Sequence, residues 1–192
     1  GTDDMLDVIL ASVIFSVLGA RLYYVIFYGN YKTFYDVIAI WNGGLAIYGA
    51  VIAGAITLVV MAKIKKRSPL VLLDIGAASI PLGQAIGRWG NFMNAEAYGY
   101  ETTLPWRMGI VEDGTTIYVH PTFFYESVWN FAGFFLLWYF YKKKKYNGQI
   151  FLAYLAWYGF GRMFIEGLRT DSLWLIPNVI RVSQLLGPVS FA

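Results

Sequence analysis

The sequence predicts an all-α integral membrane protein, a polytopic bundle of transmembrane helices. Of the 192 residues, 58% are hydrophobic and only 14% are charged, whereas about 25% of the residues of a soluble domain are charged. The mean hydropathy is +0.52. Aromatic residues make up 19% of the chain, and many lie near the ends of apolar runs, as in the aromatic belts at membrane surfaces.

Five apolar segments are long enough to cross a hydrocarbon core of about 30 Å, which takes about 20 helical residues. A sixth run is apolar but too short. The five segments and the sixth run are Met5–Tyr28, Leu45–Ala62, Leu70–Arg88, Pro121–Tyr141, Gln149–Leu168 and Val179–Ala192. The chain opens without an initiator methionine or a signal-peptide pattern. We therefore expect residues 1–192 to be a single transmembrane domain truncated at both ends, which lacks its first helix and most of its last.

Two clusters of basic residues predict the topology. Lys63–Arg67 follows the second segment and Lys142–Lys145 follows the fourth. Two crossings separate the clusters, so both are expected on the cytoplasmic side, which is enriched in lysine and arginine. The loop region of residues 90–120 is then extracytoplasmic, as is the stretch after Arg169. The remaining dense polar sequence falls on this outer side.

Composition excludes several kinds of chemistry. The chain has no cysteine, so disulfides, thiolate nucleophiles and cysteine metal sites are excluded. A single histidine leaves a zinc site short of ligands. The net charge of +3 is too small to indicate nucleic acid. Neither a Gly-x-Ser-x-Gly elbow nor a Walker loop occurs. We expect no metal, no cofactor and no nucleic-acid partner.

Four glycines of the third segment predict close helix packing. Gly76, Gly83, Gly87 and Gly90 are 7, 4 and 3 residues apart, which places them on one narrow helix face. Gly83 and Gly87 match the small-xxx-small pattern, which lets helices approach closely in membranes.

The first polar group is the run Gly87–Glu96 at the end of the third segment. A charged side chain at the bilayer centre costs about 2.5–3.5 kcal/mol on insertion scales, so such residues indicate a role. Arg88 alone could be a snorkelling anchor at the membrane surface. The hydrogen-bonding and flexible residues that follow it favour an anion site instead. They are Asn91, Asn94, Glu96 and Gly99.

The second polar group lies in the fifth segment. Tyr158, Arg162, Glu166 and Arg169 are spaced 4, 4 and 3 residues apart, so one helix face would carry all four over about three turns. Arg162 is too deep in the segment for an end anchor. A buried ion pair with Glu166 could hold the bundle together. The same pair could orient the guanidinium toward a ligand phosphate, and the two interpretations are compatible.

The third polar group precedes and begins the fourth segment. It comprises His120, Tyr125 and Glu126, with Pro121 suited to the first helical turn. His120 is either an interfacial cap or part of the site.

Two further polar residues lie in the first two segments. Arg21 lies within an apolar run and is expected to be structural. Tyr48, at the outer start of the second segment, would on its own be a belt tyrosine.

These motifs, in this order, resemble the bacterial prolipoprotein diacylglyceryl transferases over essentially the whole chain. The block Gly87–Gly99 is the family signature. The other motifs are Gly19-Ala20-Arg21 with Tyr24 and Tyr28, Trp41–Leu45, His120–Thr122 with Tyr125-Glu126, and Tyr158-Gly159 with Arg162, Glu166 and Arg169. The resemblance implies a seven-helix protein, of which this chain would hold helices two to six and the start of the seventh.

The resemblance also implies an activity. Family members move the diacylglyceryl group of phosphatidylglycerol to the lipobox cysteine of a preprolipoprotein signal peptide and release glycerol phosphate, the first step of bacterial lipoprotein maturation. The implied location is the cytoplasmic membrane, with membrane lipid as a partner and the active site facing outward. The absence of cysteine from the chain fits, because the nucleophile belongs to the substrate.

The resemblance assigns roles residue by residue. Arg88 would hold the phosphate of phosphatidylglycerol, and Arg162 the head group or leaving phosphate. The implied pocket residues are Asn91, Glu96 and Gly99. Tyr158, Glu166 and Arg169 would position Arg162 and gate lateral entry. The other supporting residues are Asn94, His120, Tyr125 and Glu126.

Tyr48 departs from the family pattern, because many members have a histidine there that has been proposed as a base toward the thiol. An ordinary tyrosine, with a pKa near 10, is a poor base. Either Tyr48 contributes to catalysis in another way, or the residue at this position only orients groups.

Two other classes of function are possible. A transporter or channel for an anionic substrate would suit the buried arginines, but the chain shows no internal repeat of the kind that many transporters have. A non-catalytic membrane scaffold would not need the polar residues of Arg88–Glu96.

Overall fold

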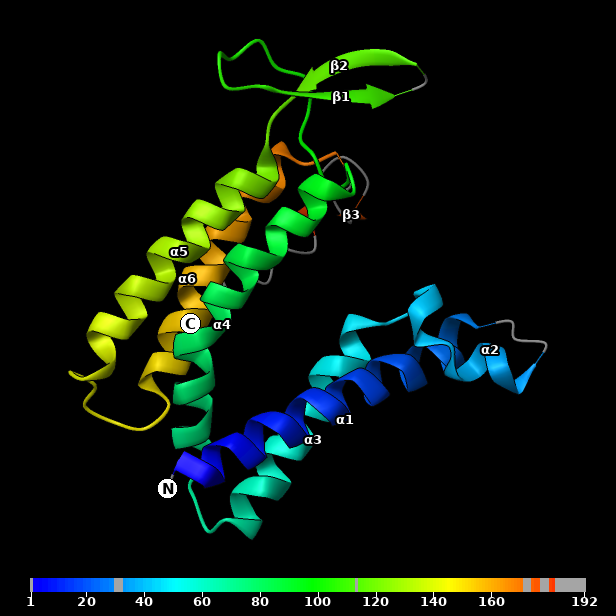
Figure 1. Cartoon of the computed structure of the whole chain (residues 1–192). Coiled ribbons are helices and arrows are strands. Elements are labelled where there is room, and N and C mark those ends of the chain that lie inside the picture. The colour runs from blue at the N-terminus through cyan, green and yellow to red at the C-terminus, as the bar shows by residue number, and fades with distance from the viewer. Residues whose placement is uncertain (1, 30–32, 113, 171–173, 177–179, 182–192) are drawn as a thin grey trace. The chain divides into compact units, whose positions relative to one another are not determined.

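The computed structural model describes residues 2–29, 33–112, 114–170, 174–176 and 180–181. Contacts divide the chain into two compact units, Gly1–Leu72 and Leu73–Ala192. The elements in chain order (Figure 1) are α1 Thr2–Tyr28, α2 Phe34–Ile38, η1 Ile40–Asn42, α3 Ile47–Ile64, α4 Pro69–Met93, β1 Met108–Glu112, β2 Thr115–Val119, α5 Thr122–Tyr141, α6 Gln149–Ile165, η2 Glu166–Leu168, β3 Trp174–Ile176 and β4 Ile180–Arg181.

The described part of the chain is mostly helical, as a membrane protein of this composition should be. Three of its helices, α1, α3 and α4, are long and apolar enough to cross a membrane. Helix α5 has 20 residues and α6 has 17. Each of the five predicted segments corresponds to one of these five helices, and the predicted and observed ends differ by at most five residues.

The prediction of an all-α protein was wrong in one respect, because two antiparallel hairpins are present, β1–β2 and β3–β4. The first joins two runs rich in Val, Ile and Thr around the dipeptide Asp-Gly at 113–114, a strong hairpin signal. The second involves the sixth apolar run. Most of Val179–Ala192 lies outside the described residues, but Ile180–Arg181 forms strand β4 rather than the start of a helix.

Small residues hold the first unit together. Helices α1 and α3 pack side by side (Figure 1). They are so close that a Cβ added at Gly49 would lie 2.2 Å from the carbonyl oxygen of Gly19, and one added at Gly19 would lie 2.3 Å from the Cβ of Ala53. At the far end of the pair, Lys65 contacts Asp7, and this bond raises the pKa of the lysine above its ordinary value.

Arg21 makes its contacts within the first unit. Its guanidinium donates to four backbone carbonyls of the connection between α1 and α3, those of Asp36, Val37, Gly43 and Gly44. The side chain is buried, and four carbonyl partners satisfy a buried guanidinium. These bonds agree with the structural role expected for Arg21.

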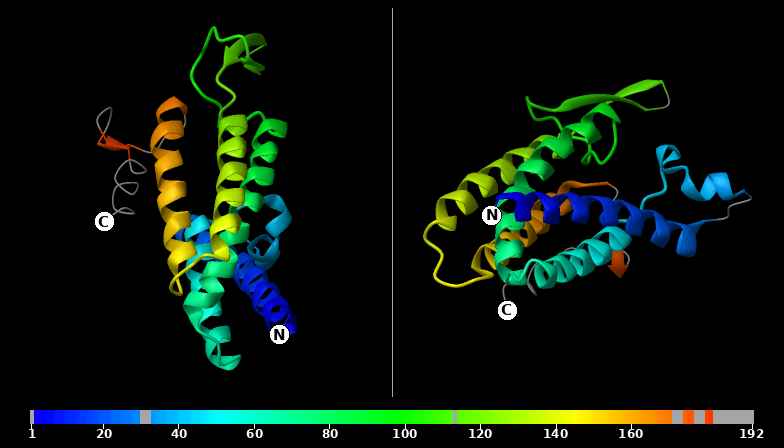
Figure 2. Two further views of the ribbon diagram at one scale, coloured as in Figure 1. Left: turned by 90° about the vertical axis from the view of Figure 1, so that its left-hand side faces the viewer. Right: turned by 60° about the horizontal axis from the view of Figure 1, so that its bottom comes forward.

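The second unit is built on helices α4, α5 and α6, which lie side by side in two views (Figures 1 and 2). Within this unit the glycine stripe of α4 makes no close contact. Apart from neighbouring residues and the backbone of α4 itself, no atom of the described residues lies within 4 Å of a Cβ built at Gly76, Gly83, Gly87 or Gly90. Polar contacts join the helices instead. The Trp89 indole donates to Ser127 Oγ at 3.2 Å, and Ser127 donates to the Ala85 carbonyl at 2.9 Å.

Asp74 of α4 caps the start of α6. Its carboxylate is fully buried and accepts from the backbone N–H groups of Gly148, Ile150 and Phe151 at 2.9–3.0 Å. Lys144 adds an ion pair at 2.9 Å. The first N–H groups of a helix have no partner within the helix, so a carboxylate from a neighbouring helix supplies both hydrogen bonds and a favourable charge.

We expect Asp74→Ala to destabilise the protein by about 3 kcal/mol or more, because three buried N–H groups and the Lys144 ammonium lose their partner together. Thermal unfolding in detergent measures the loss. Asp74→Asn, which keeps one acceptor oxygen, should cost less than the alanine. An unchanged unfolding midpoint for Asp74→Ala would contradict the capping role.

Candidate active site

The site begins at the C-terminal end of α4, which runs five residues beyond the predicted end at Arg88. Asn91 is therefore helical rather than part of a loop. The helix ends in a Schellman motif: Glu96 N–H donates to the Asn91 carbonyl and Ala95 N–H to that of Phe92, with Ala95 in the left-handed region at φ 49°. Because the helix continues, Asn91 lies one turn above Arg88 and accepts from its guanidinium at 3.2 Å.

Glu126 of α5 is the centre of the site. Its side chain is 4% exposed and pairs with three guanidinium groups, which we call the arginine cluster. The three are Arg88 of α4 at 2.6 Å, Arg162 of α6 at 3.3 Å and Arg169 at 3.2 Å. A buried carboxylate holds its charge only where opposite charges compensate it. Sequence reasoning assigned Glu126 a supporting place, and the structure gives it the central one.

The predicted ion pair between Arg162 and Glu166 is confirmed. The prediction that one helix face carries all four residues from Tyr158 to Arg169 was wrong. Helix α6 ends at Ile165, Glu166 begins the 3-10 turn η2, and Arg169 has extended backbone at φ −86° and ψ 146°. This change of direction brings the Arg169 side chain back to Glu126.

Gly99, in the loop after α4, contacts the backbone at His120 and at Arg169. Its N–H donates to the His120 carbonyl at 3.0 Å, and it forms an isolated β-bridge with Arg169. A Cβ at this position would lie 2.7 Å from the Leu168 carbonyl oxygen and 2.7 Å from the His120 Cβ. Only glycine fits this close crossing of two backbones.

Two polar networks contain other residues of the predicted site. In the first network, Glu96 Oε1 accepts from Asn91 at 2.9 Å and from Asn94 at 3.3 Å. The bond between Asn91 and Arg88 connects these residues to the arginine cluster. In the second network, the Tyr125 hydroxyl lies 3.3 Å from His120 Nδ1 and accepts from the Trp106 indole at 2.9 Å.

Two other predicted residues, Tyr158 and Tyr48, belong to different units of the chain. Tyr158 lines a cavity of about 10 Å³ beside Arg162 and Glu126, which is no larger than one water molecule. Tyr48 belongs to the first unit, where it is the second residue of α3. The residue is 60% exposed, and the centre of its ring lies 6.2 Å from the centre of the Tyr23 ring.

The charges of the site favour an anion. Among the described residues, the arginine cluster brings three guanidinium groups to two carboxylates, Glu126 and Glu166. The side chains of Arg88 and Arg162 are still 23% and 20% exposed, while Glu126 is enclosed. Planar guanidinium groups suit two phosphate oxygens at once. Among the described residues, no group of three His, Asp or Glu side chains could hold a metal ion.

Sequence reasoning missed a pair of tryptophans one turn from the arginine cluster. The Trp129 indole of α5 donates to the Trp157 carbonyl of α6, and the Trp157 indole donates to the Trp129 carbonyl, both at 3.1 Å. The two rings are stacked, with their centres 4.2 Å apart. Gly133 and Gly161 make room for them. The signal was present, since the pattern Trp-x-x-x-Gly occurs in both helices.

We expect Gly161→Ala to push the tryptophan pair apart, because a Cβ there would lie 2.1 Å from Trp129 Nε1. The predicted cost is about 1–3 kcal/mol of stability, with a loss of activity as Arg162 moves away from Glu126. Gly83→Ala in α4 is the matched control and should not lower the unfolding midpoint, because its Cβ has open space and alanine is the better helix former. Equal effects of the two variants in thermal unfolding would contradict this account.

Comparison with known proteins shows the family of the chain. The family model for prolipoprotein diacylglyceryl transferase matches residues 1–192. The chain belongs to the prolipoprotein diacylglyceryl transferase family. A relative from Finegoldia magna, named phosphatidylglycerol–prolipoprotein diacylglyceryl transferase, is 51% identical over 95% of this chain and 72% of its own length. A Streptococcus pneumoniae relative with the same name is 49% identical over 97% of this chain and 74% of its own. The resemblance inferred from the motifs is confirmed.

Proposed function

We propose that this protein transfers the diacylglyceryl group of phosphatidylglycerol to the lipobox cysteine of preprolipoproteins. The proposal is supported by the names of the two relatives, phosphatidylglycerol–prolipoprotein diacylglyceryl transferase. The observation that supports it most directly is the arginine cluster around Glu126, because the side chains of Arg88 and Arg162 remain 23% and 20% exposed there. A phosphate head group is the ligand that this arrangement suits.

In this proposal the substrate thiol, as thiolate, attacks the carbon of the diacylglyceryl group that bears the phosphate oxygen. The C–S bond forms, the C–O bond breaks, the thiol proton is released, and glycerol phosphate leaves with the electron pair. Arg88 holds the phosphate of the lipid, and Arg162 stabilises the negative charge that grows on the leaving group. Glu166 and Arg169 position Arg162, while Asn91, Glu96 and Gly99 shape the pocket.

We also propose the membrane arrangement. Helices α5 and α6 would cross the membrane with α1, α3 and α4, in one transmembrane domain of the bacterial cytoplasmic membrane. Lys144 contacts Asp74 near the start of α4, whereas Arg88 lies 14 residues further along the helix, or about 21 Å at 1.5 Å per residue. This separation supports an active site on the outer side, opposite the lysines.

The deciding experiment uses the purified protein in vesicles that contain phosphatidylglycerol, with a peptide that carries a lipobox cysteine. Mass spectrometry should find the diacylglyceryl group on the cysteine, and glycerol phosphate should appear in equal amount. A peptide with serine in place of the cysteine is the control. Folded protein that yields no adduct would sink the proposal; transport of an anion without adduct would favour a transporter.

Tyr48→Phe tests the proton transfer from the thiol. We propose that Tyr48 orients groups rather than accepting the proton, because a phenol is a poor base. The variant should keep transfer within about tenfold of the wild type, since a general base contributes about 100-fold or more. A fall of that larger size in the peptide assay would assign the hydroxyl as the base.

A further inference from the structure

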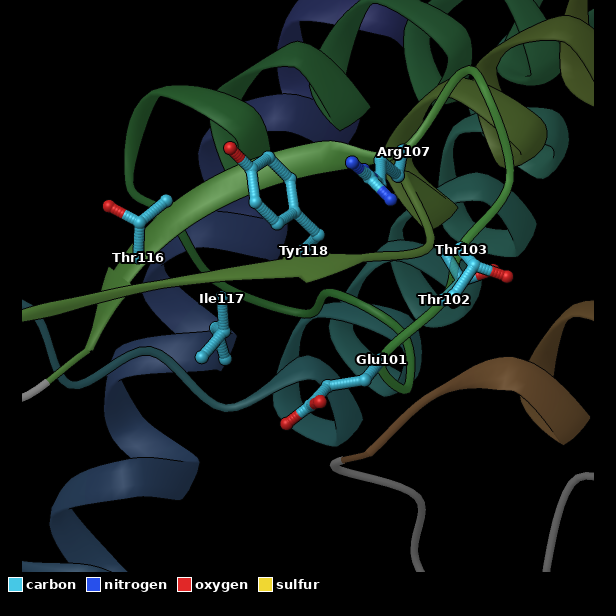
Figure 3. A pocket seen from close by; sticks show the side chains of 7 residues that line it. All are labelled: Glu101, Thr102, Thr103, Arg107, Thr116, Ile117 and Tyr118. Carbon is cyan, nitrogen blue, oxygen red and sulfur yellow. The ribbon is translucent and has the colours of Figure 1, made fainter.

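A polar cavity of about 540 Å³ lies away from the arginine cluster, between the segment 101–107 and strand β2 (Figure 3). Thr116 and Tyr118 stand on one face of β2 and Ile117 on the other (Figure 3). The Arg107 guanidinium lies 4.3 Å from the centre of the Tyr118 ring, and Glu101 brings an opposite charge to the same cavity. The cavity therefore offers a positive group, a negative group and neutral hydroxyls, which together can donate and accept hydrogen bonds.

One edge of β2 is open at this cavity. On its other edge β2 pairs with β1 in a continuous register. On the cavity edge, Thr102 N–H donates to the Tyr118 carbonyl at 2.9 Å, and the segment then leaves the strand. Backbone groups of alternate residues face the same edge of a strand, so Thr116 points its N–H and C=O into the cavity. In the part of the chain that the structure describes, neither has a hydrogen-bond partner on that edge.

The open edge is joined to the active site by four residues of chain. Gly99, which crosses His120 and Leu168 in the site, begins the segment, and Thr102 ends it beside the cavity. At about 3.3 Å per residue the two positions are roughly 10 Å apart. A peptide whose reacting residue lies in the site can therefore reach the edge of β2 with the residues that follow.

We propose that the open edge of β2 binds, as an added strand, the part of the preprolipoprotein that follows its reacting cysteine. This inference rests on the proposed function. Strand addition draws affinity from main-chain hydrogen bonds, which Thr116 supplies, and threonine, arginine and glutamate side chains suit an extended polar peptide better than a lipid chain. The predicted extracytoplasmic location of residues 90–120 puts the edge on the side where the mature part of the substrate emerges.

The first test uses the absence of cysteine from the chain, which makes Thr116→Cys a single thiol. The probe is a lipobox peptide with serine for the reacting cysteine and a new cysteine about six residues further on. An added strand would lie about 4.8 Å from β2 but about 9.6 Å from β1, and a disulfide needs Cα atoms within about 7 Å. Cross-linking should be at least tenfold greater for Thr116→Cys than for Val111→Cys, its register partner on β1.

The second test compares two lipobox peptides in the transfer assay, one ending just after the cysteine and one extended by about ten residues. The extended peptide should have a KM about fivefold lower, as two main-chain hydrogen bonds would give. Thr116→Pro removes the N–H on the open edge and should bring the KM ratio close to one. Val111→Pro removes an N–H on the opposite edge and should keep the wild-type ratio.

The outcomes separate the two proposals. Adduct on both peptides with equal KM, or equal cross-linking at both positions, would overturn strand addition while leaving the enzyme proposal intact. Adduct on neither peptide would overturn the proposed function, and the cross-linking would still decide the docking. Disulfide-linked dimers of Thr116→Cys in place of peptide cross-links would assign the edge to a second copy of the chain.

Discussion

Replacing Glu126 by glutamine is expected to lower diacylglyceryl transfer by about 100-fold or more and to destabilise the protein by about 3–5 kcal/mol. The glutamine keeps the shape of the side chain but removes the charge that compensates Arg88, Arg162 and Arg169. All three guanidinium groups lie within 3.3 Å of the carboxylate oxygens, so their mutual repulsion would separate them. Mass spectrometry of the peptide adduct and thermal unfolding in detergent measure the two effects.

Glu112→Gln is the matched control, because this carboxylate lies exposed on β1 in the same unit. It should change neither quantity. Transfer by Glu126→Gln at the wild-type rate would show that the arginine cluster needs no carboxylate at its centre, and would remove the main support for the site as described.

Arg88→Ala and Arg162→Ala are each expected to abolish measurable transfer, a loss of about 1000-fold or more, while membrane insertion is unchanged. Positioned guanidinium groups that stabilise charge on a leaving phosphate contribute on this scale. Lysine at either position keeps the charge but loses the planar fork, so Arg88→Lys and Arg162→Lys should recover part of the activity. Initial rates in phosphatidylglycerol vesicles measure both series.

Arg67→Ala serves as the control for the loss of an arginine. Arg67 is exposed, and its guanidinium forms a surface ion pair with Asp4 at 3.4 Å. It should transfer at the wild-type rate. If either alanine variant of the cluster turned over as fast as Arg67→Ala, the phosphate-binding role of that arginine would be refuted.

The helices could be predicted because lipid leaves the backbone no other partner. A run of about 20 apolar residues in a bilayer must satisfy its own hydrogen bonds, and a helix does so within one segment. The ends were less certain, since caps depend on local geometry. A left-handed Ala95 ends α4 five residues after Arg88, and nothing in the apolar pattern marks that position.

Contacts between helices were harder to predict than the helices themselves. The glycine stripe of α4 looked like a packing face, yet the close approach in that unit occurs at Gly133 and Gly161, against tryptophan rings. Spacing on a helix shows which residues share a face, but not what that face meets. The same limit applies to Asp74, whose partners lie 70 to 77 residues away in the chain.

For this protein the sequence by itself determined the membrane class, the family and the identity of the polar residues, because burying charge in lipid is costly enough to make each such residue informative. Only the tertiary structure decided that Glu126 is the shared partner of three arginines, that Arg169 returns to it beyond the end of α6, and that β2 keeps an open edge. These are contacts between segments distant in sequence, and their geometry depends on how helix ends and strands turn, which no local pattern specifies.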